Sequence, residues 1–239
     1  MHKPFTFKQF VVAQDRCAAK IGTDGVLLGG WVSLAQQPRS ILDIGTGTGI
    51  IALQQAQRSD AQTIDALELD PDAYEQATEN FENSVWNDRL FCYHASFQEF
   101  VAEMDDTYDL IITNPPYYEP HQKSDNTLRD LARFEDALPF SELIQGVAQL
   151  LTPEGQFAVI IPYHREADFI RLAAKADLVP IRITHVRGRA DTPLKRSLLQ
   201  FAISPHSQTL TKDELVIEKE RHEYTAAYKS IVHDFYLKM

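Results

Sequence analysis

The sequence predicts an α/β fold: a doubly wound, Rossmann-like sheet of seven mostly parallel strands with an antiparallel hairpin at its C-terminal end. Short apolar runs alternate with helical segments from about residue 40 onward, which is typical of βαβ units. A glycine-rich stretch stands where the first apolar run passes into the first helical segment. The last two apolar runs are joined by a polar loop that contains Gly188 and Pro193, which favours antiparallel pairing.

The predicted elements follow one another in a regular order. The runs expected to form the parallel strands are apolar over most of their length, as buried strands are; they are residues 40–44, 63–67, 90–93, 108–112 and 156–161. The helical segments between them are residues 49–58, 72–84, 97–104 and 139–151. Thr152 to Gly155 reads as a turn between the last of these helices and the fifth strand. A further helix over 166–176 precedes the hairpin strands, 181–186 and 198–203.

The chain is expected to form one domain over residues 1–239, because its length and its 44% of hydrophobic residues suit a single core. Residues 1–39 are an N-terminal extension, 40–204 the core and 205–239 a C-terminal appendage. No stretch approaches the roughly 18 apolar residues of a membrane span, and the N-terminus lacks a signal-peptide run. Cys17 and Cys92 lack metal-ligand spacing. We therefore expect a soluble, cytoplasmic protein that has no membrane partner and binds no metal.

Charge is distributed unevenly along the chain. The net charge of -11 argues at first against a nucleic-acid partner. However, residues 41–110 contain 15 acidic and 2 basic residues, whereas residues 1–40 and 161–210 are each net basic. The acidic character therefore belongs mainly to one segment, and the basic segments remain candidates for contact with phosphate.

The glycine-rich loop is the most specific local signal. Asp43 is followed by Gly45, Gly47 and Gly49 where the first strand turns into a helix. Glycines at such a turn let the backbone approach a ligand closely and place a helix N-terminus beside it. A dinucleotide fingerprint reads G-x-G-x-x-G, whereas this loop reads G-x-G-x-G, which favours S-adenosylmethionine over NAD.

An adenosine cofactor also needs a carboxylate after the second strand, about 20 residues beyond the glycine loop, to bind its ribose hydroxyls. Glu68 occupies this position, with Asp70 as the alternative. Asp43 either caps the turn or lies near the methionine ammonium, and we favour the second role.

A second motif, Asn114-Pro115-Pro116-Tyr117, follows the fourth strand. An amine conjugated to an aromatic ring is a poor nucleophile, and hydrogen bonds to the Asn114 side-chain oxygen and the Pro115 carbonyl would concentrate electron density on its nitrogen. The prolines restrict φ and hold that carbonyl in place, while Tyr117 offers a face for an unstacked base. A planar amide nitrogen would suit the same geometry, so the motif selects a type of nitrogen rather than one molecule.

These motifs resemble those of the class I methyltransferases that modify adenine N6 or glutamine N5, with their D-x-G-x-G-x-G and N-P-P-Y signatures. The chain is still more similar to the bacterial tRNA1(Val) adenine-37 N6-methyltransferase family. The segments that carry this similarity span nearly the whole chain: Phe5 to Phe10, Asp15 to Ala18, Gly22 to Gly29, Tyr224 to Ala226 and Asp234 to Leu237.

The resemblance implies S-adenosyl-L-methionine as cofactor, a cover over it from residues 20–24, and an adenine held by Asn114 to Tyr117. The expected catalytic residues are Asn114, Pro115, Pro116 and Tyr117. The expected cofactor-binding residues are Lys20, Thr23, Asp24, Asp43, Gly45, Thr46, Gly47, Glu68, Leu69, Ser96, Phe97 and Asn114. Ser96 departs from the family pattern, which often has an Asp that binds the cofactor adenine; a hydroxyl accepts that bond more weakly.

A tRNA partner requires phosphate contacts. We expect basic residues of both net-basic segments to form a rim near the acceptor loop, which is the loop that contains Asn114 to Tyr117, with the acidic face turned away. The alternative is that these residues are ordinary charged residues exposed to solvent. The expected RNA-binding residues are Lys8, Arg16, Arg129, Arg187, Arg189, Lys195 and Arg196; Lys3 lies in the N-terminal basic segment, whereas Arg129 and Arg133 lie in the polar segment 118–136. Residues 118–136 read as a lid or a peripheral helix, and His164 is expected to be structural.

The predicted function is S-adenosylmethionine-dependent N6-methylation of an adenine in tRNA, by a monomer. Methylation of a protein glutamine is the nearest rival, although such enzymes usually carry a separate recognition domain. DNA adenine methylation would need a large target-recognition insert, and a small-molecule amine also remains open. A non-catalytic RNA-binding protein or a nucleotide-dependent oxidoreductase fits less well, since Asn114 and Tyr117 are intact and the glycine spacing differs.

Overall fold

The computed structural model describes residues 3–115, 138–203 and 209–239. Its centre is an eight-stranded sheet with the strand order β10-β8-β9-β7-β6-β3-β4-β5. The strands are β3 (Ser40–Ile44), β4 (Thr63–Glu68), β5 (Leu90–His94), β6 (Tyr108–Thr113), β7 (Leu151–Pro162), β8 (Leu178–Arg187), β9 (Arg196–Ile203) and β10 (Thr211–Val216). Only β9 runs antiparallel to its neighbours within this sheet. The predicted fold class and antiparallel hairpin are confirmed.

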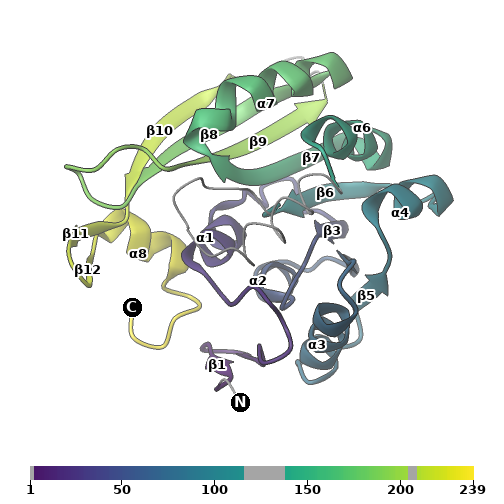
Figure 1. The fold of residues 1–239 in the computed structure, drawn as a ribbon, viewed down its shortest axis with the longest axis horizontal. Helices are drawn as coiled ribbons and strands as arrows, with labels where there is room; N and C mark the ends of the chain where they lie inside the picture. Colours follow the sequence, from purple (N-terminus) through teal and green to yellow (C-terminus); the bar gives the residue numbers. More distant parts are fainter. Residues whose placement is uncertain (1–2, 116–137, 204–208) are drawn as a thin grey trace, which may run out of the picture.

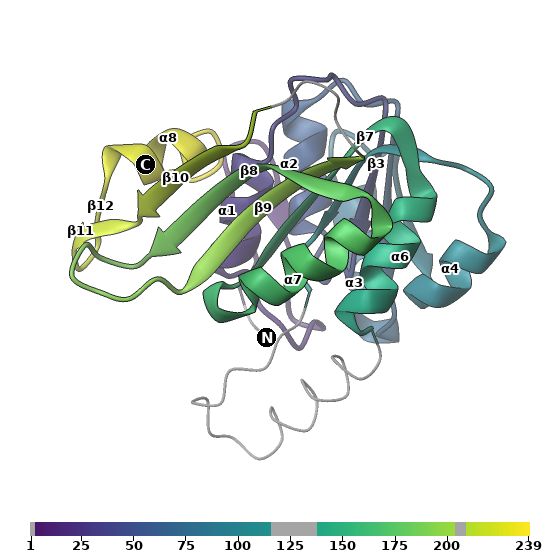
Figure 2. The same cartoon turned by 90° about the horizontal axis from the view of Figure 1, so that it is seen from above.

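Helices cover both faces of the sheet. Helices α1 (Thr23–Trp31), α2 (Ile50–Arg58), α3 (Pro71–Glu82) and α8 (Ala226–Val232) pack into one hydrophobic cluster, and α4 (Phe97–Glu103), α6 (Phe140–Leu150) and α7 (Glu166–Ala173) pack into the other. Figure 1 shows these two groups on opposite sides of the sheet, and Figure 2 shows the same layers from above. Alternate strand residues feed the two clusters: Leu110 and Ile112 face the first, and Ile111 faces the second.

The smaller elements lie at the ends of the chain and around α7. They are β1 (Phe5–Thr6), β2 (Val11–Val12), the 3-10 helices η1 (Tyr163–Arg165) and η2 (Ala174–Ala176), β11 (Glu218–Glu220) and β12 (Glu223–Tyr224). Within the described residues, no helix combines the length and the apolar character that crossing a membrane requires.

The sheet has one strand more than the seven predicted. Strand β10 lies in the segment interpreted as a C-terminal appendage, and it pairs in parallel with β8. Four of its six residues are exposed and only Leu215 is buried. An exposed edge strand with charged residues lacks the apolar run that marks a buried strand, so its sequence pattern did not reveal it.

The predicted turn from Thr152 to Gly155 is assigned to strand β7, which begins directly after α6. Tyr108 pairs with Leu151 and Leu110 with Gln156, so the register shifts across these residues. Thr152 to Gly155 therefore form an irregular insertion at the start of the strand. The turn-like composition is explained by this local break in the ladder.

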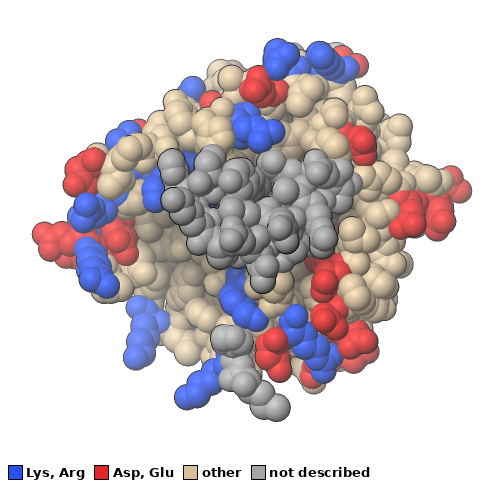
Figure 3. Space-filling model, in the orientation of Figure 1, with Lys and Arg blue, Asp and Glu red and all other residues tan. Residues whose placement is uncertain are grey.

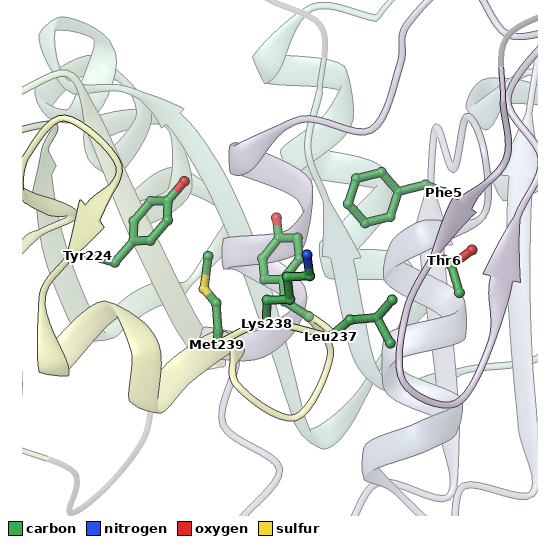
Figure 4. A pocket seen from close by; sticks show the side chains of 7 residues that line it. Phe5, Thr6, Tyr224, Leu237, Lys238 and Met239 are labelled. Carbon is green, nitrogen blue, oxygen red and sulfur yellow. The ribbon is translucent and has the colours of Figure 1, made fainter.

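Both ends of the described chain pack together. The Lys8 amide donates to the Phe235 carbonyl at 2.8 Å, and Phe7 forms a β-bridge with Tyr236. The rings of Phe5 and Phe7 are 4.6 Å apart. Figure 4 shows a pocket between these two chain segments, with a volume of about 340 Å³, lined mainly by aromatic and aliphatic side chains. The sequence segments at the two ends thus form one structural unit.

Helix α1 is held to α2 by buried polar side chains that bind its carbonyl groups. Gln54 donates to the Val26 carbonyl at 3.0 Å, and Gln55 donates to the Gly29 carbonyl at 2.9 Å. The Arg58 guanidinium donates to the carbonyls of Gly29 and Val32 at 2.6 and 3.0 Å. These bonds satisfy backbone groups at the C-terminal end of α1 and fix the helix relative to the glycine loop that precedes α2.

We expect Gly30→Ala to destabilise the fold by separating α1 from α8. A Cβ at residue 30 would lie 2.5 Å from the Ile231 carbonyl oxygen and 3.0 Å from the Ile231 side chain. Such overpacking costs roughly 1–3 kcal/mol, which exceeds the gain of about 0.5–1 kcal/mol from removing a helical glycine. Thermal unfolding should therefore show a lower Tm.

Gly188→Ala is the matched control, since the nearest atom to its added Cβ is 3.8 Å away. An equal or higher Tm for Gly30→Ala than for the wild type would contradict the tight α1–α8 contact.

Candidate active site

The glycine loop connects β3 to α2 at the carboxyl edge of the sheet. Gly45, Gly47 and Gly49 have φ values of +68°, +57° and +81°, which are left-handed conformations that favour glycine. The Thr46 amide donates to the Leu67 carbonyl at 2.9 Å, which ties the loop to the end of β4. The sequence therefore forms this loop because only glycine adopts these three conformations at low cost.

Asp43 is buried beneath the loop, with a relative exposure of 1%. Its Oδ2 accepts hydrogen bonds from the Thr46 hydroxyl at 2.6 Å and from the Ala52 amide at 3.2 Å. Its Oδ1 has no hydrogen-bond partner among the described residues. Burial raises the pKa of Asp43 to about 7, against the lowering effect of the two hydrogen bonds. A carboxylate with one oxygen unsatisfied is suited to a cation that arrives with a ligand.

Glu68 closes the loop from the end of β4. Its Oε2 accepts from the Gly47 amide at 2.8 Å, and its Oε1 accepts from the Leu69 and Asp70 amides at 2.9 and 3.0 Å. Asp70 instead caps α3 by accepting from the Ala73 amide at 2.9 Å. Of the two alternative carboxylates, Glu68 is the one bonded to the glycine loop, and it retains acceptor capacity for a hydroxyl group.

The space above the glycine loop is open. A Cβ built on Gly45 or Gly47 would meet no other atom within 4 Å. A Cβ on Gly49 would instead lie 2.5 Å from the Phe81 ring, so this glycine is required by packing as well as by φ. Gly45 and Gly47 thus leave room for a ligand to approach the backbone, beside the N-terminus of α2.

Asn114 follows β6 at the same edge of the sheet as the glycine loop, because β6 pairs in parallel with β3 and Thr113 lies opposite Ile44. A Cβ added at Gly25 of α1 would lie 3.9 Å from Asn114 Nδ2. The N-terminal turn of α1 therefore borders the predicted acceptor site. Pro115 is buried, while Pro116 and Tyr117 lie outside the described residues.

Asp24, in the first turn of α1, forms an ion pair with Arg196 at the start of β9, with Arg196 Nε 2.8 Å from Asp24 Oδ2. The sequence analysis assigned Asp24 to the cofactor and Arg196 to RNA. The structure brings these two side chains together, on the border between the predicted cofactor and acceptor positions. Sequence reasoning did not foresee this ion pair, because 172 residues separate its partners.

Four other expected cofactor residues have defined roles in the fold. Ser96 caps α4 in a capping box: its hydroxyl donates to Glu99 Oε2 at 2.7 Å and accepts from the Glu99 amide at 3.2 Å. Phe97 is buried in the second hydrophobic cluster. The Lys20 ammonium donates to the carbonyls of Gln14 and Cys17. Leu69 is exposed, and its amide binds Glu68. The S-x-x-E pattern was a readable signal for the capping box.

The expected RNA-binding residues are distributed over several elements, and most of those described have protein partners. Arg16 pairs with Glu75 and Glu79, Arg187 with Glu214, and Arg189 with Asp191. The Lys8 ammonium donates to the His233 carbonyl. Lys195 is exposed, and Arg129 lies outside the described residues. Figure 3 shows lysine and arginine side chains interspersed with acidic ones on the face of the molecule that is turned to the viewer in Figure 1. A continuous basic rim therefore stays a prediction.

The described residues contain no group of three or more His, Cys, Asp or Glu side chains that could hold a metal ion. Cys17 is buried and Cys92 is half-buried, and neither forms a disulfide. Burial is the main cause that raises the pKa values of both thiols, to about 11 and about 12 respectively. Both side chains are therefore unreactive thiols in this fold.

Comparisons with known proteins show which family this chain resembles. The family model for the methyltransferase small domain matches residues 27–176. A protein of Christiangramia forsetii named tRNA1(Val) (adenine(37)-N6)-methyltransferase is 57% identical over 100% of this chain and 99% of its own length. A protein of the same name from Flavobacterium psychrophilum is 56% identical over 98% of this chain and 100% of its own length.

Among solved structures, a predicted O-methyltransferase from Agrobacterium tumefaciens matches with a TM-score of 0.70 and 19% identity, over 89% of this chain and 96% of that one. At this identity the likeness shows the fold alone. The strand order of the sheet and the match to the methyltransferase small domain define a class I methyltransferase.

The similarity to named relatives over the full chain is more specific. The chain belongs to the tRNA1(Val) (adenine(37)-N6)-methyltransferase family.

We expect Asp43 to make the stability of the ligand-free protein depend on pH. In the unfolded chain Asp43 ionises near its ordinary pKa of 3.8, whereas the folded protein retains the proton up to a pKa of about 7. The folded state therefore binds more protons between these values, so the contribution of Asp43 to the free energy of unfolding falls as the pH rises from about 4 to 7. Asp43→Asn should remove this fall, which amounts to a few kcal/mol.

Urea unfolding at a series of pH values measures this effect as the difference between wild type and variant. Asp72→Asn makes the same substitution at an exposed position of α3 and should leave the pH dependence nearly unchanged. Parallel curves for the wild type and Asp43→Asn would contradict the raised pKa.

Proposed function

We propose that this protein transfers a methyl group from S-adenosyl-L-methionine to N6 of an adenine in tRNA, at adenine 37 of tRNA1(Val). One observation carries the proposal: the adjacent parallel strands β4, β3 and β6 bring Glu68, Asp43 and Asn114 to the same edge of the sheet. The names of relatives that match the whole chain support the choice of acceptor. Such a substrate would place the enzyme in the cytoplasm, and we propose separately that it acts as a monomer.

The residues around the glycine loop fit S-adenosylmethionine. Oδ1 of Asp43, which has no partner among the described residues, is available to the methionine ammonium, and an ionised Asp43 would be stabilised by that charge. Glu68 has acceptor capacity left for ribose hydroxyls. Gly45 and Gly47 leave open space in which the cofactor can approach the backbone. When bound, the cofactor supplies an electrophilic methyl group.

Asn114 and Pro115 supply the chemistry on the acceptor side. The Asn114 side-chain oxygen and the Pro115 carbonyl accept hydrogen bonds from the two hydrogens of the adenine N6 amine. These bonds draw the nitrogen lone pair out of conjugation and direct it toward the methyl group. The amine proton then leaves to water, so no side chain with a tuned pKa is required. Restricted φ at Pro115 and Pro116 helps to hold the carbonyl in position.

Methylation of a protein glutamine would use the same acceptor geometry, and it remains the second candidate only on chemical grounds. The two relatives named above as tRNA methyltransferases match this chain over 99% and 100% of their own length. We therefore place RNA adenine first and keep the amide as the outcome to be tested.

Asn114→Ala should lower the rate of methyl transfer by roughly 100- to 1,000-fold, because a hydrogen bond made in the transition state is lost. Unmodified tRNA1(Val) transcript and isotopically labelled S-adenosylmethionine are incubated with each protein, and digested nucleosides are analysed by mass spectrometry. Asn114→Asp keeps an acceptor oxygen and should retain much more activity than Asn114→Ala.

N6-methyladenosine formed only by an enzyme with an acceptor oxygen at residue 114 supports the proposal. Cofactor binding without label in any RNA would reject it in favour of an amide or small-molecule acceptor. Equal activity of Asn114→Ala and the wild type would reject the role of Asn114.

Arg189→Glu should weaken tRNA binding about tenfold at low salt and reduce the salt dependence of binding, as expected for the loss of one phosphate contact. The effect should vanish at high salt, because screening removes the charge term. Filter binding at several salt concentrations measures it. Arg171→Glu, at an exposed position of α7, is the matched charge reversal and should change affinity little. Equal effects of the two variants would reject a phosphate contact at Arg189.

A further inference from the structure

Tyr163 follows β7 as the first residue of η1, and the residue is 39% exposed. Strand β7 pairs in parallel with β6, with Val159 opposite Thr113. The ends of these two neighbouring strands therefore lie at one edge of the sheet. Tyr163 leaves that edge from β7 as Asn114 leaves it from β6, although β7 continues three residues beyond Val159, so an exposed aromatic residue lies on the same edge of the sheet as the predicted acceptor position.

The Tyr163 ring is braced by a cluster of polar side chains. It packs against the His185 ring in a T-shaped arrangement with centroids 4.9 Å apart. His185 Nε2 lies 2.8 Å from Glu166 Oε2, and the Ser197 hydroxyl donates to the same carboxylate oxygen. Ser197 is fully buried. The Tyr163 amide also donates to the Lys195 carbonyl at 3.0 Å.

This cluster has no part in the proposed cofactor site. Its residues belong to η1, α7, β8 and β9, whereas the glycine loop and Glu68 belong to the ends of β3 and β4. Packed polar networks hold side chains in one arrangement, and a ring held in one arrangement loses less entropy when another ring stacks on it. The cluster thus prepares an exposed aromatic surface for contact with a ligand.

A positive charge accompanies this ring. The exposed Lys195 is joined to Tyr163 through its own backbone carbonyl. The next residue, Arg196, is anchored to α1 through Asp24. Single-stranded RNA is bound by this combination: a base stacks on an aromatic side chain while a cation contacts the adjoining phosphate.

We propose that Tyr163 is a stacking platform for an unpaired RNA base that flanks the target adenine, and that Lys195 contacts the phosphate next to that base. This inference rests on the proposed function and adds a second base contact to it. The platform contacts the face of a base by stacking and makes no hydrogen bonds to its edge, so it accepts a flanking base of any type. Its role is to hold the loop of the RNA while the target adenine occupies the acceptor site.

The platform is tested by removing each side of the contact separately. Fluorescence anisotropy measures the Kd for an anticodon stem-loop RNA of tRNA1(Val), with the intact base or an abasic site at each nucleotide flanking the target adenine. Tyr163→Ala should weaken binding of the intact RNA about 5- to 100-fold, and Tyr163→Phe should bind almost as the wild type does. One abasic RNA should bind the wild type correspondingly more weakly, and Tyr163→Ala should bind it and the intact RNA equally.

His164→Ala alters the exposed neighbouring side chain and should bind as the wild type does. The Kd for S-adenosylmethionine and the Tm of Tyr163→Ala should match those of the wild type, which a merely structural role for the ring would not allow. The comparison of intact and abasic RNA on the wild type needs no variant, so it remains decisive even if Tyr163→Ala does not fold.

Three outcomes would overturn the platform. The first is that Tyr163→Ala binds the intact RNA as tightly as the wild type does. The second is that the loss of affinity of Tyr163→Ala persists unchanged with each abasic RNA. The third is that neither abasic site changes the affinity of the wild type. If the wild type methylates the RNA while one of these outcomes is observed, the platform is rejected and the proposed function still holds. Wild-type protein that neither binds nor methylates the RNA would overturn both proposals.

Discussion

The parallel pairing of β3 with both β4 and β6 is the constraint on which the rest of this structure depends. Parallel neighbours end at the same edge of a sheet, and α2, which follows β3, packs on the opposite face from α6, the next described helix after β6. Asp43, Glu68 and Asn114 therefore meet although their strands are distant in sequence. The hydrogen bond from the Gly47 amide to Glu68 then couples the loop after β3 to the end of β4.

Much of this architecture could be predicted from local patterns, and the exceptions have physical reasons. The five parallel strands are short apolar runs, and their turns carry recognisable residues. Helix α1 was missed because six of its nine residues are buried and three interior positions are glycine, so it shows no polar face and no helical periodicity. Strand β10 was missed for the opposite reason, since one of its residues alone is buried. Both elements are defined by their neighbours rather than by their own sequence.

The candidate site divides along a similar line. The glycine loop, Asp43 and Glu68 are encoded by spacing within one βαβ unit, which a sequence displays directly. Ser96 has a different role in the structure from the one its sequence position predicted, because its hydroxyl is bonded to Glu99 in the capping box of α4. Arg196 and Asp24 could not be paired in advance, because their contact depends on how β9 lies against α1. The same is true of Tyr163, whose brace from His185, Glu166 and Ser197 joins four elements. Long-range polar contacts of this kind have no periodicity in the sequence.

The contact between the two ends of the chain affects the order in which the molecule can be completed. The segment around Phe7 and Lys8 finds its partners at Phe235 and Tyr236, which the ribosome synthesises more than 200 residues later. During translation the first segment cannot make these contacts until the last helix has emerged. Domains generally fold as units during synthesis, yet here the N-terminal segment gains these contacts only after α8 has been synthesised.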